Sequence, residues 1–146
     1  MQMATVSQIM NKRPKSVGPS TSVRSAAKTM RTARVGSLLI KKGKAHIGIV
    51  TETDLVRKAL GSDKNLTKMS VEDIMTTPLC SIESDSTVDD AQDMMGDLGV
   101  RHLAVTKNGD VVGMVSVRDL LMHYKRYAQS KISTEAKYEE PKIAQD

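Results

Sequence analysis

The sequence predicts an α/β (α+β) fold, in which two pseudo-symmetric β-α-β-β-α repeats pack through their sheets into one module. Three observations support this prediction. Residues 6–55 match residues 71–120 without a gap when the chain is shifted against itself by 65 positions. In each copy, apolar residues recur first at helical spacing and then in short runs typical of strands. Hydrophobic residues make up 39% of the 146 positions, so we expect one shared module rather than two independent domains.

A short strand and a helix should open each repeat. The strands begin near Ser16 and Ser81, and each is followed by a hydroxyl residue at a helix N-cap position, Ser22 or Thr87. After each cap, apolar side chains recur every three to four residues, as in an amphipathic helix. These side chains are Val23, Ala26, Ala27, Met30 and Ala33 in the first repeat and Val88, Ala91, Met94, Met95 and Leu98 in the second.

A strand, a glycine turn, a second strand and a closing helix complete each repeat. In the first repeat we expect the strands over 37–40 and 47–51 and the helix over 53–60. In the second repeat we expect the same elements over 102–105, 111–116 and 117–128.

These elements divide the chain into four segments. Repeat 1 is expected to cover residues 5–62 and repeat 2 residues 71–128, joined by a polar linker over 63–70. Residues 129–146 are polar, with several Glu, Lys and Gln, and are expected to form a disordered tail.

Composition excludes several classes of protein. There is no Phe or Trp, and all three tyrosines lie after residue 123, so aromatic platforms for single-stranded nucleic acid are absent. The longest uncharged apolar run, Val35 to Ile40, is too short to cross a bilayer, and no signal peptide is visible. A single cysteine cannot form an internal disulfide. We therefore expect a cytoplasmic protein with no membrane partner.

The net charge of +5 is unevenly distributed along the chain. Residues 1–65 contain 13 Lys and Arg against 3 Asp and Glu, whereas residues 66–128 contain 6 against 10. This asymmetry is typical of an anion-binding face or of two halves that attract each other. A nucleic-acid-associated protein that uses its basic first repeat is the alternative function to be weighed.

One motif closes both predicted hairpins. Gly-Ile-Val-Thr-Glu-Thr-Asp at 48–54 falls on Gly-Met-Val-Ser-Val-Arg-Asp at 113–119. The glycine has no Cβ, which lets another backbone or a flat base approach the strand. A carboxylate in the first turn of a helix, at Asp54 or Asp119, can accept two hydrogen bonds from a vicinal ribose diol. Thr51 and Ser116 can cap the same helices and offer a hydroxyl to a ligand.

This duplicated motif resembles a tandem pair of CBS domains, the Bateman module. Ile-Met at 74–75 and Gly-Val-Arg-His-Leu at 99–103 support the resemblance, which covers about residues 5–128. It implies a regulatory module that binds an adenosine-containing ligand between its repeats and modulates a separate, unidentified protein. The ligand would be AMP, ADP, ATP, S-adenosylmethionine or NAD. ATP would bring Mg²⁺ with it, and no other cofactor is required.

The resemblance implies a ligand site in each repeat. Repeat 1 would contribute Ser16, Val17, Ser37, Leu38, Thr51 and Asp54. Repeat 2 would contribute Ser81, Ile82, Arg101, His102, Leu103, Ser116, Arg118 and Asp119. Within these sets, the aliphatic side chains would form adenine slots, and Arg101 and His102 would point at the phosphate. Uncharged Gly36 and Ser37 replace that pair in repeat 1, so repeat 2 should hold the tighter phosphate site.

A simpler interpretation of each residue stays open at this stage. Thr51 and Ser116 would be ordinary N-caps, with the two aspartates merely occupying first turns. Arg101 would be a solvated surface residue, and His102 a strand residue without a ligand.

Neither catalysis nor metal binding is expected. His46 and His123 have no second ligand at metal-binding spacing, and Cys80 suits a small buried filler better than a reactive thiol. We therefore expect a non-enzymatic module that stands alone, without an attached enzyme.

A homodimer is expected from charge inversion between the repeats. Arg24 and Lys28 lie on one face of the first helix, and the equivalent positions in repeat 2 are Asp89 and Asp93. Modules that this chain resembles commonly dimerise through these helices. A head-to-tail arrangement, repeat 1 against repeat 2, would pair opposite charges and bury stripes that include Met30 and Met95.

Overall fold

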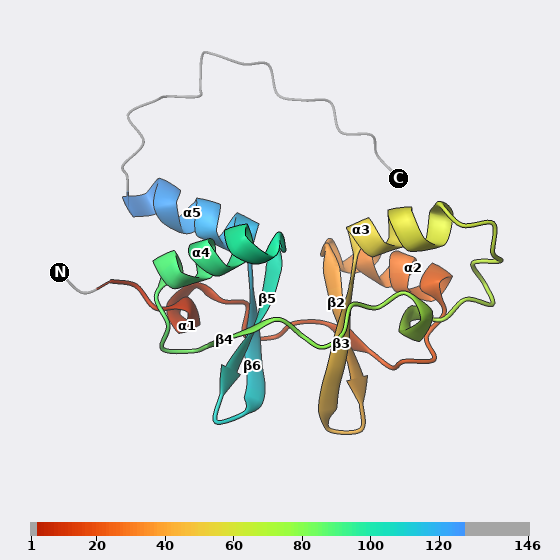
Figure 1. The fold of residues 1–146 in the computed structure, drawn as a ribbon, viewed down its shortest axis with the longest axis horizontal. Coiled ribbons are helices and arrows are strands. Elements are labelled where there is room, and N and C mark those ends of the chain that lie inside the picture. The colour runs from red at the N-terminus through yellow and green to blue at the C-terminus, as the bar shows by residue number, and fades with distance from the viewer. Residues whose placement is uncertain (1–2, 128–146) are drawn as a thin grey trace, which may run out of the picture.

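The computed structural model describes residues 3–127, so the expected tail lies outside the described residues. Both repeats have the expected element order (Figure 1). Repeat 1 comprises β1 (Ser16–Val17), α2 (Val23–Ala33), β2 (Ser37–Lys42), β3 (Ala45–Thr51), α3 (Glu52–Asp54) and η1 (Leu55–Leu60). Repeat 2 comprises β4 (Ser81–Glu83), α4 (Val88–Leu98), β5 (His102–Lys107), β6 (Asp110–Ser116) and α5 (Val117–Tyr127). Two short helices, α1 (Val6–Ile9) and η2 (Val71–Asp73), open the two repeats, ahead of their first strands.

The two long amphipathic helices begin at the predicted caps. Ser22 Oγ accepts a hydrogen bond from the backbone N–H of Ser25 at 3.1 Å, and Thr87 Oγ1 accepts one from Asp90 at 3.0 Å. Each bond satisfies one of the N–H groups that the first helical turn leaves without a partner. The capping residues therefore fix where α2 and α4 start.

The closing helices of the two repeats differ. In repeat 2, α5 is a regular α-helix of 11 residues. In repeat 1, α3 lasts only three residues and continues as the π-helix η1, in which Gly61 N donates to Val56 O at 2.8 Å. The expected helix over 53–60 is therefore present but has a wider helical turn.

Each repeat contains one three-stranded sheet, and the two sheets have equivalent registers. The orders are β1-β2-β3 and β4-β5-β6, with the first pair parallel and the second antiparallel in each sheet. Ser16 pairs with Leu39 in the first sheet, and Ser81 pairs with Ala104 in the second. The 65-residue shift relates both pairs, so the internal repeat of the sequence is a repeat of structure.

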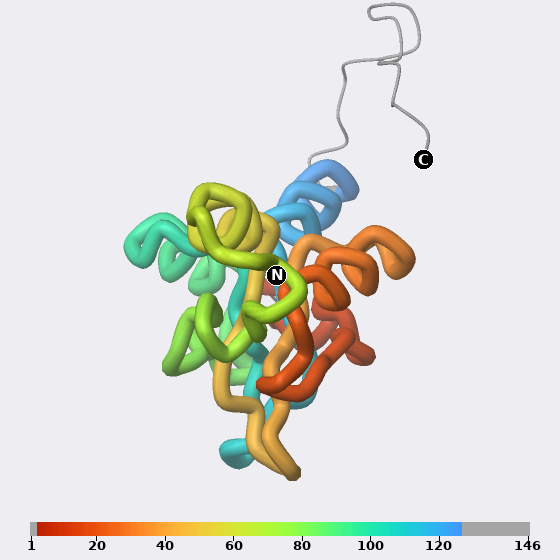
Figure 2. The backbone as a smooth tube through the Cα atoms, turned by 90° about the vertical axis from the view of Figure 1, so that its right-hand side faces the viewer, coloured from red at the N-terminus to blue at the C-terminus, as the bar shows by residue number. Residues whose placement is uncertain are grey.

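The sheets pack against each other and form the centre of the module. Leu39 and Ile49 of repeat 1 share a buried cluster with Ala104 and Met114 of repeat 2. Strand alternation sends the neighbouring Leu38 to the other face of its sheet, into the core under α2. Figures 1 and 2 show the two hairpins side by side and pointing the same way. The predicted packing of the repeats through their sheets is confirmed.

The segment that opens each repeat, ahead of its first strand, packs on the other repeat. Val6 of α1 belongs to the core of repeat 2, whereas Val71 and Ile74 belong to the core of repeat 1. Figure 1 shows both segments crossing the middle of the molecule. Met69, in the expected linker, is buried with the repeat 1 core as well. The two spatial halves therefore exchange segments, and neither half of the sequence contains a complete core.

Two backbone pairings hold these two opening segments, which we call the crossing segments, in place. Asn11 and Met114 exchange N–H···O bonds of 2.8 and 3.0 Å, and Thr76 and Ile49 exchange bonds of 2.8 and 3.0 Å. Because Asn11 and Thr76 are 65 positions apart, as are Ile49 and Met114, the pairings are equivalent. Each crossing segment thus adds one bridge to a strand of the opposite repeat.

The motif glycines make this approach possible. A Cβ on Gly113 would lie 2.7 Å from Asn11 O and 2.5 Å from Met10 Sδ. A Cβ on Gly48 would lie 2.9 Å from Thr76 O and 2.8 Å from Met75 Sδ. Of the two roles that the sequence allowed for these glycines, the structure assigns the approach of another backbone.

Tyr124 joins α5 to α4. Its hydroxyl donates to Asp89 Oδ1 at 2.7 Å and lies 2.7 Å from Gln92 Oε1. Burial raises the pKa of Tyr124 to about 12, with further contributions from the hydrogen bond to Asp89 and from the charges of Asp89 and Asp93. Asp89, one of the two α4 aspartates expected at the dimer contact, is therefore hydrogen-bonded within its own repeat.

Candidate functional site

The Ser-x-x-Asp segment of repeat 2 forms a capping box at the start of α5. Asp119 N donates to Ser116 Oγ at 3.3 Å, and the Asp119 carboxylate oxygen Oδ2 accepts from Ser116 N at 2.8 Å and from Ser116 Oγ at 3.0 Å. Among residues 3–127, no group bonds to the other oxygen, Oδ1. The capping interpretation of the motif is therefore correct, and Oδ1 of the half-buried Asp119 has no partner among the described residues.

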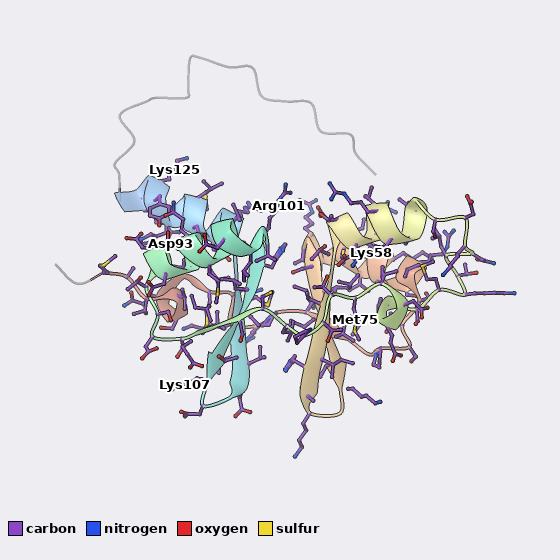
Figure 3. All side chains as sticks on the ribbon, in the orientation of Figure 1. Lys58, Met75, Asp93, Arg101, Lys107 and Lys125 are labelled. Atoms are coloured by element: carbon purple, nitrogen blue, oxygen red, sulfur yellow. The ribbon has the colours of Figure 1, made fainter. Side chains whose placement is uncertain are left out.

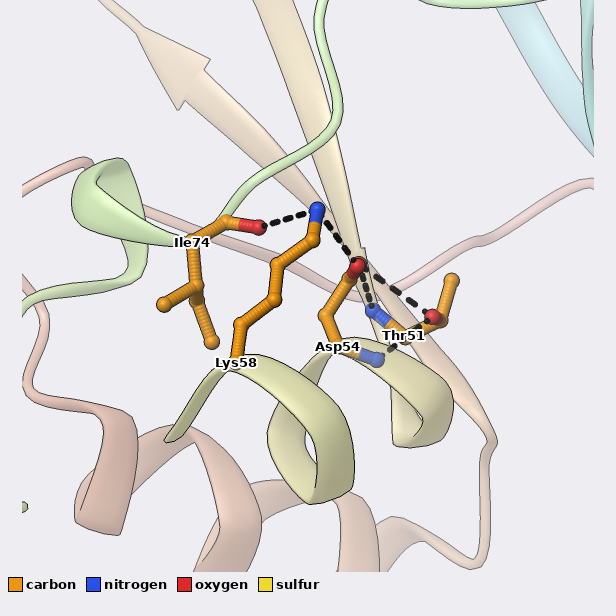
Figure 4. A network of polar contacts seen from close by, with 4 residues as sticks. All are labelled: Thr51, Asp54, Lys58 and Ile74. Carbon is orange, nitrogen blue, oxygen red and sulfur yellow. Dashed lines mark hydrogen bonds and ion pairs between the residues drawn. The ribbon is translucent and has the colours of Figure 1, made fainter. Parts of the chain in front are cut away.

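The equivalent segment of repeat 1 has a second layer of contacts (Figure 4). Asp54 Oδ2 accepts from Thr51 N at 3.0 Å and from Thr51 Oγ1 at 3.2 Å, as in repeat 2. Asp54 Oδ1 is paired with Lys58 Nζ at 2.9 Å, and the same ammonium group donates to Ile74 O at 3.2 Å. Both oxygens of this carboxylate are therefore engaged, and Asp54 is only 5% exposed.

The charges of Glu52, Arg101 and Asp119 all act on His102, and we refer to these four residues as the junction cluster. Burial lowers the pKa of His102; the charges of Glu52 and Asp119 act in the opposite direction, and the charge of Arg101 lowers the pKa further. His102 is therefore neutral at pH 7, where it can donate one hydrogen bond. Glu52 comes from repeat 1 and the other three residues from repeat 2, so the cluster spans the boundary between the repeats.

Arg101 gives this cluster its exposed positive charge. It lies directly before β5, between the two repeats (Figure 3), and its carbonyl accepts from Val117 N at 3.0 Å. The backbone therefore ties Arg101 to the start of the helix that carries Asp119. Arg118 is also exposed at this helix start, next to Asp119 in the chain.

The equivalent position in repeat 1 has the opposite electrostatic character. Glu52 N donates to Gly36 O at 3.0 Å, matching the Val117–Arg101 bond. The Glu52 carboxylate folds over this glycine, with its carbon and Oε1 both 3.4 Å from where a Cβ of Gly36 would be. Repeat 1 thus has a carboxylate beside Gly36, the position that is Arg101 in repeat 2, so the charge difference between the two sites is larger than Gly36 and Ser37 alone suggested.

The expected adenine slots need correction. The four aliphatic side chains assigned to them pack inside the cores of the separate repeats, and Leu38 and Leu103 are 0% exposed. Val17 and Ile82 pack against the same two cores. Strand alternation is the physical reason, because it sends these residues toward the helices rather than toward the opposite repeat. Ser16 and Ser81 are exposed, and Ser37 is half-buried at the start of β2.

An open depression of about 450 Å³ lies on repeat 1, between α2 and the α3–η1 helix. Glu52 lines it, but none of the ligand residues predicted from the sequence does. This depression therefore does not coincide with the motif residues.

Sequence reasoning did not single out Glu52 or Lys58. Glu52 occupies a helix N1 position that is Val117 in repeat 2, so the repeat gave no reason to select it. Lys58 could have been found, because it lies four residues after Asp54 on a predicted helix, a spacing at which opposite charges pair. The duplicated Ile-Met at 9–10 and 74–75 was also a signal of the crossing segments, since it matches outside any predicted strand or helix.

The helices described over residues 3–127 include none that is long and apolar enough to cross a membrane.

Comparisons with known proteins agree with the structural repeat. The family model of the CBS domain matches residues 6–61 and again residues 71–126. An uncharacterized 17.7 kDa protein of Acidianus ambivalens is 39% identical over 121 residues, which cover 81% of this chain and 72% of that protein. An uncharacterized protein of Methanopyrus kandleri is 32% identical over 123 residues; this chain spans only 63% of its length, and 83% of this chain is matched.

A solved structure agrees as well. The crystal structure of a CBS-domain-containing protein from Agrobacterium tumefaciens has a TM-score of 0.78 and 27% identity, covering 82% of this chain and 98% of that one. Both family matches coincide with the two structural repeats described above. The chain therefore belongs to the CBS-domain family and carries two CBS domains.

Proposed function

We propose that this pair of CBS domains, a type of regulatory module, binds an adenosine-containing nucleotide at repeat 2 and modulates a separate protein. The observation that carries the proposal is the Asp119 carboxylate, which its capping box fixes while Oδ1 has no hydrogen-bond partner within residues 3–127. A carboxylate held in this way is pre-organised to accept hydrogen bonds from a ribose diol.

Arg101 and His102 complete the proposed site. The guanidinium of Arg101 supplies a planar set of donors suited to phosphate, and neutral His102 supplies one more hydrogen bond. Glu52 opposes a phosphate at this place, so the net attraction depends on Arg101. With ATP as ligand, Mg²⁺ would offset part of the phosphate charge near Glu52.

The crossing segments couple ligand binding at repeat 2 to the orientation of repeat 1. The core of each repeat includes residues of the crossing segment that opens the other repeat. A ligand that prefers one relative orientation of the repeats therefore shifts both repeats together. A partner that docks on the helices would then sense the occupied state through its own preference for that orientation.

A thermal-shift panel tests the ligand class. AMP, ADP, ATP, S-adenosylmethionine and NADH should include at least one compound that raises the unfolding midpoint, because a ligand of the folded state stabilises it in proportion to the logarithm of its concentration. Inorganic phosphate and GMP serve as controls for charge and ribose without adenine. A midpoint that no adenosine compound raises, even at millimolar concentration, contradicts the proposal.

The same thermal-shift measurement, with duplex DNA added at different salt concentrations, distinguishes nucleotide binding from the alternative function in nucleic-acid binding. Short duplex DNA that binds through the basic first repeat would raise the midpoint only at low salt, since such binding weakens steeply as salt rises. Binding at Asp119 and Arg101 involves fewer charges and is expected to persist in 200 mM salt.

A head-to-tail homodimer through the helices is part of this proposal. The charge rows on α2 and α4 are exposed, apart from the Asp89–Tyr124 contact, and remain complementary. The apolar contacts differ from those expected, because Met30 and Met95 are buried in their own repeats. The closing helices instead carry the exposed apolar side chains Val56, Leu60, Leu121 and Met122.

Carbodiimide crosslinking tests the orientation of this dimer. A head-to-tail arrangement should give an intermolecular Lys28–Asp93 crosslink, since carbodiimide joins only amines and carboxylates in direct contact. An amine-reactive reagent that joins Lys28 to Lys28 of a second copy would contradict it, and a strict monomer at high protein concentration would remove the dimer altogether.

A further inference from the structure

We propose that Lys58 closes the ligand site of repeat 1, so that the module takes one nucleotide per chain, at repeat 2. This inference rests on the proposed function, because it assigns that function to one of two related sites. It makes Lys58 a specificity-determining residue and gives Asp54 a structural role in place of a ligand-binding one.

The first support is the state of the Asp54 carboxylate. Oδ2 is taken by two hydrogen bonds from Thr51, and Oδ1 by the ammonium group of Lys58 at 2.9 Å. The side chain is 7% exposed. A ribose diol could reach this carboxylate only by displacing Lys58, whereas Oδ1 of Asp119 needs no such displacement.

The second support is that Lys58 is held from two sides. Besides pairing with Asp54, it donates to Ile74 O at 3.2 Å, and Ile74 belongs to the crossing segment buried in repeat 1 (Figure 4). An exposed ion pair at this spacing contributes little by itself. Here, removing the ammonium would leave Oδ1 of a nearly buried carboxylate and the Ile74 carbonyl without this partner, which opposes displacement of Lys58 by a ligand.

The third support is that the corresponding residue of repeat 2 is chemically different. The position equivalent to Lys58 is His123, on a regular α-helix rather than on the π-helix η1. His123 contacts the ring of Tyr124, edge to face, with the ring centres 5.5 Å apart. Asp119 is half-buried rather than buried. The two repeats therefore differ in the side chain that lies four residues after the motif aspartate.

Glu52 adds a second obstacle in repeat 1. Its carboxylate lies over Gly36, at the position where repeat 2 places Arg101 ahead of its strand. A nucleotide in repeat 1 would therefore meet a closed ribose acceptor and a negative charge near its phosphate. Adenosine, which has no phosphate, would meet only the first.

The experiment is calorimetric titration of the full chain and of its Lys58→Ala variant, with AMP and adenosine as separate probes. Wild type should bind one AMP per chain. Lys58→Ala should gain a second site that binds adenosine at least about tenfold more tightly than AMP, because Glu52 stays in place. Lys68→Ala, which removes an exposed lysine of the linker, should keep one site.

A second variant guards against a change in folding. Asp54→Asn should keep the wild-type AMP affinity within about twofold, while its thermal midpoint falls by about 4 °C from the loss of the ion pair. Two AMP molecules per wild-type chain, an unchanged stoichiometry in Lys58→Ala, or a tenfold loss of AMP binding in Asp54→Asn would each overturn the inference. If wild type binds neither AMP nor adenosine, the proposed function fails. In that case, adenosine binding gained in Lys58→Ala would still support closure of the repeat 1 site by Lys58. If Lys58→Ala gained no adenosine binding either, the closure would be refuted as well.

Discussion

Gly113→Ala should destabilise the module by about 3 kcal/mol, the largest stability effect expected of a single methyl group in this chain. The added Cβ would lie 2.7 Å from Asn11 O, a backbone atom that already accepts a hydrogen bond from Met114. Relief of the contact must move the crossing segment and weaken that pairing. Overpacking costs about 1–3 kcal/mol and each lost hydrogen bond about 1 kcal/mol, so the thermal midpoint should fall by about 10 °C.

Two other glycines provide matched controls for this prediction. Gly48→Ala should destabilise less, since the equivalent distances are 2.9 Å to Thr76 O and 2.8 Å to Met75 Sδ. Gly96→Ala, inside α4 with nothing within 4 Å of the added Cβ, should stabilise the module by about 0.5–1 kcal/mol through helix propensity. Equal changes of the thermal unfolding midpoint in all three variants would show that the motif glycines are not required for the close approach of the crossing segments.

Arg101→Ala should weaken AMP binding by about ten- to hundredfold. A hydrogen bond to a charged group contributes roughly 1.5–3 kcal/mol, and the only other donor proposed for the phosphate, His102, is neutral at pH 7. Adenosine affinity should change less than about threefold, because adenosine has no phosphate. Calorimetry with both compounds measures the two effects on the same protein.

Arg126→Ala is the control for net charge, since Arg126 is exposed near the far end of α5. It should leave the AMP affinity within about twofold at physiological salt, where exposed charges at that distance are screened. Equal losses of AMP and adenosine in Arg101→Ala, or equal losses of AMP in the two arginine variants, would refute the phosphate assignment.

The repeat and its elements were predictable because their signals are local. Hydroxyl residues at Ser22 and Thr87 satisfy N–H groups of their own helices, and the spacing of apolar residues defines which helix face is buried. The capping roles of Thr51 and Ser116 follow from the same local chemistry. A 65-residue shift then doubles every signal, which is why the fold could be predicted from one sequence.

The exchange of segments was not predictable from such signals. Nothing in the sequence around Val6 or Val71 states which of two similar cores the side chain enters, because both cores present aliphatic residues at equivalent positions. The direction of Leu38 and Leu103 was missed for a related reason. In a short strand with consecutive apolar residues, such as Leu38 to Ile40, either face can be assigned to the core, so alternation gives no unique answer.

Calorimetric titration of AMP into wild type and Asp119→Ala tests the central claim most directly, with Asp90→Ala as its control. Asp90 forms the same capping box with Thr87 at the start of α4, away from the junction cluster, so both variants should lose similar stability. The account predicts that wild type and Asp90→Ala bind one AMP with similar affinity, and that Asp119→Ala binds at least about tenfold more weakly. Unchanged AMP binding in Asp119→Ala would contradict it.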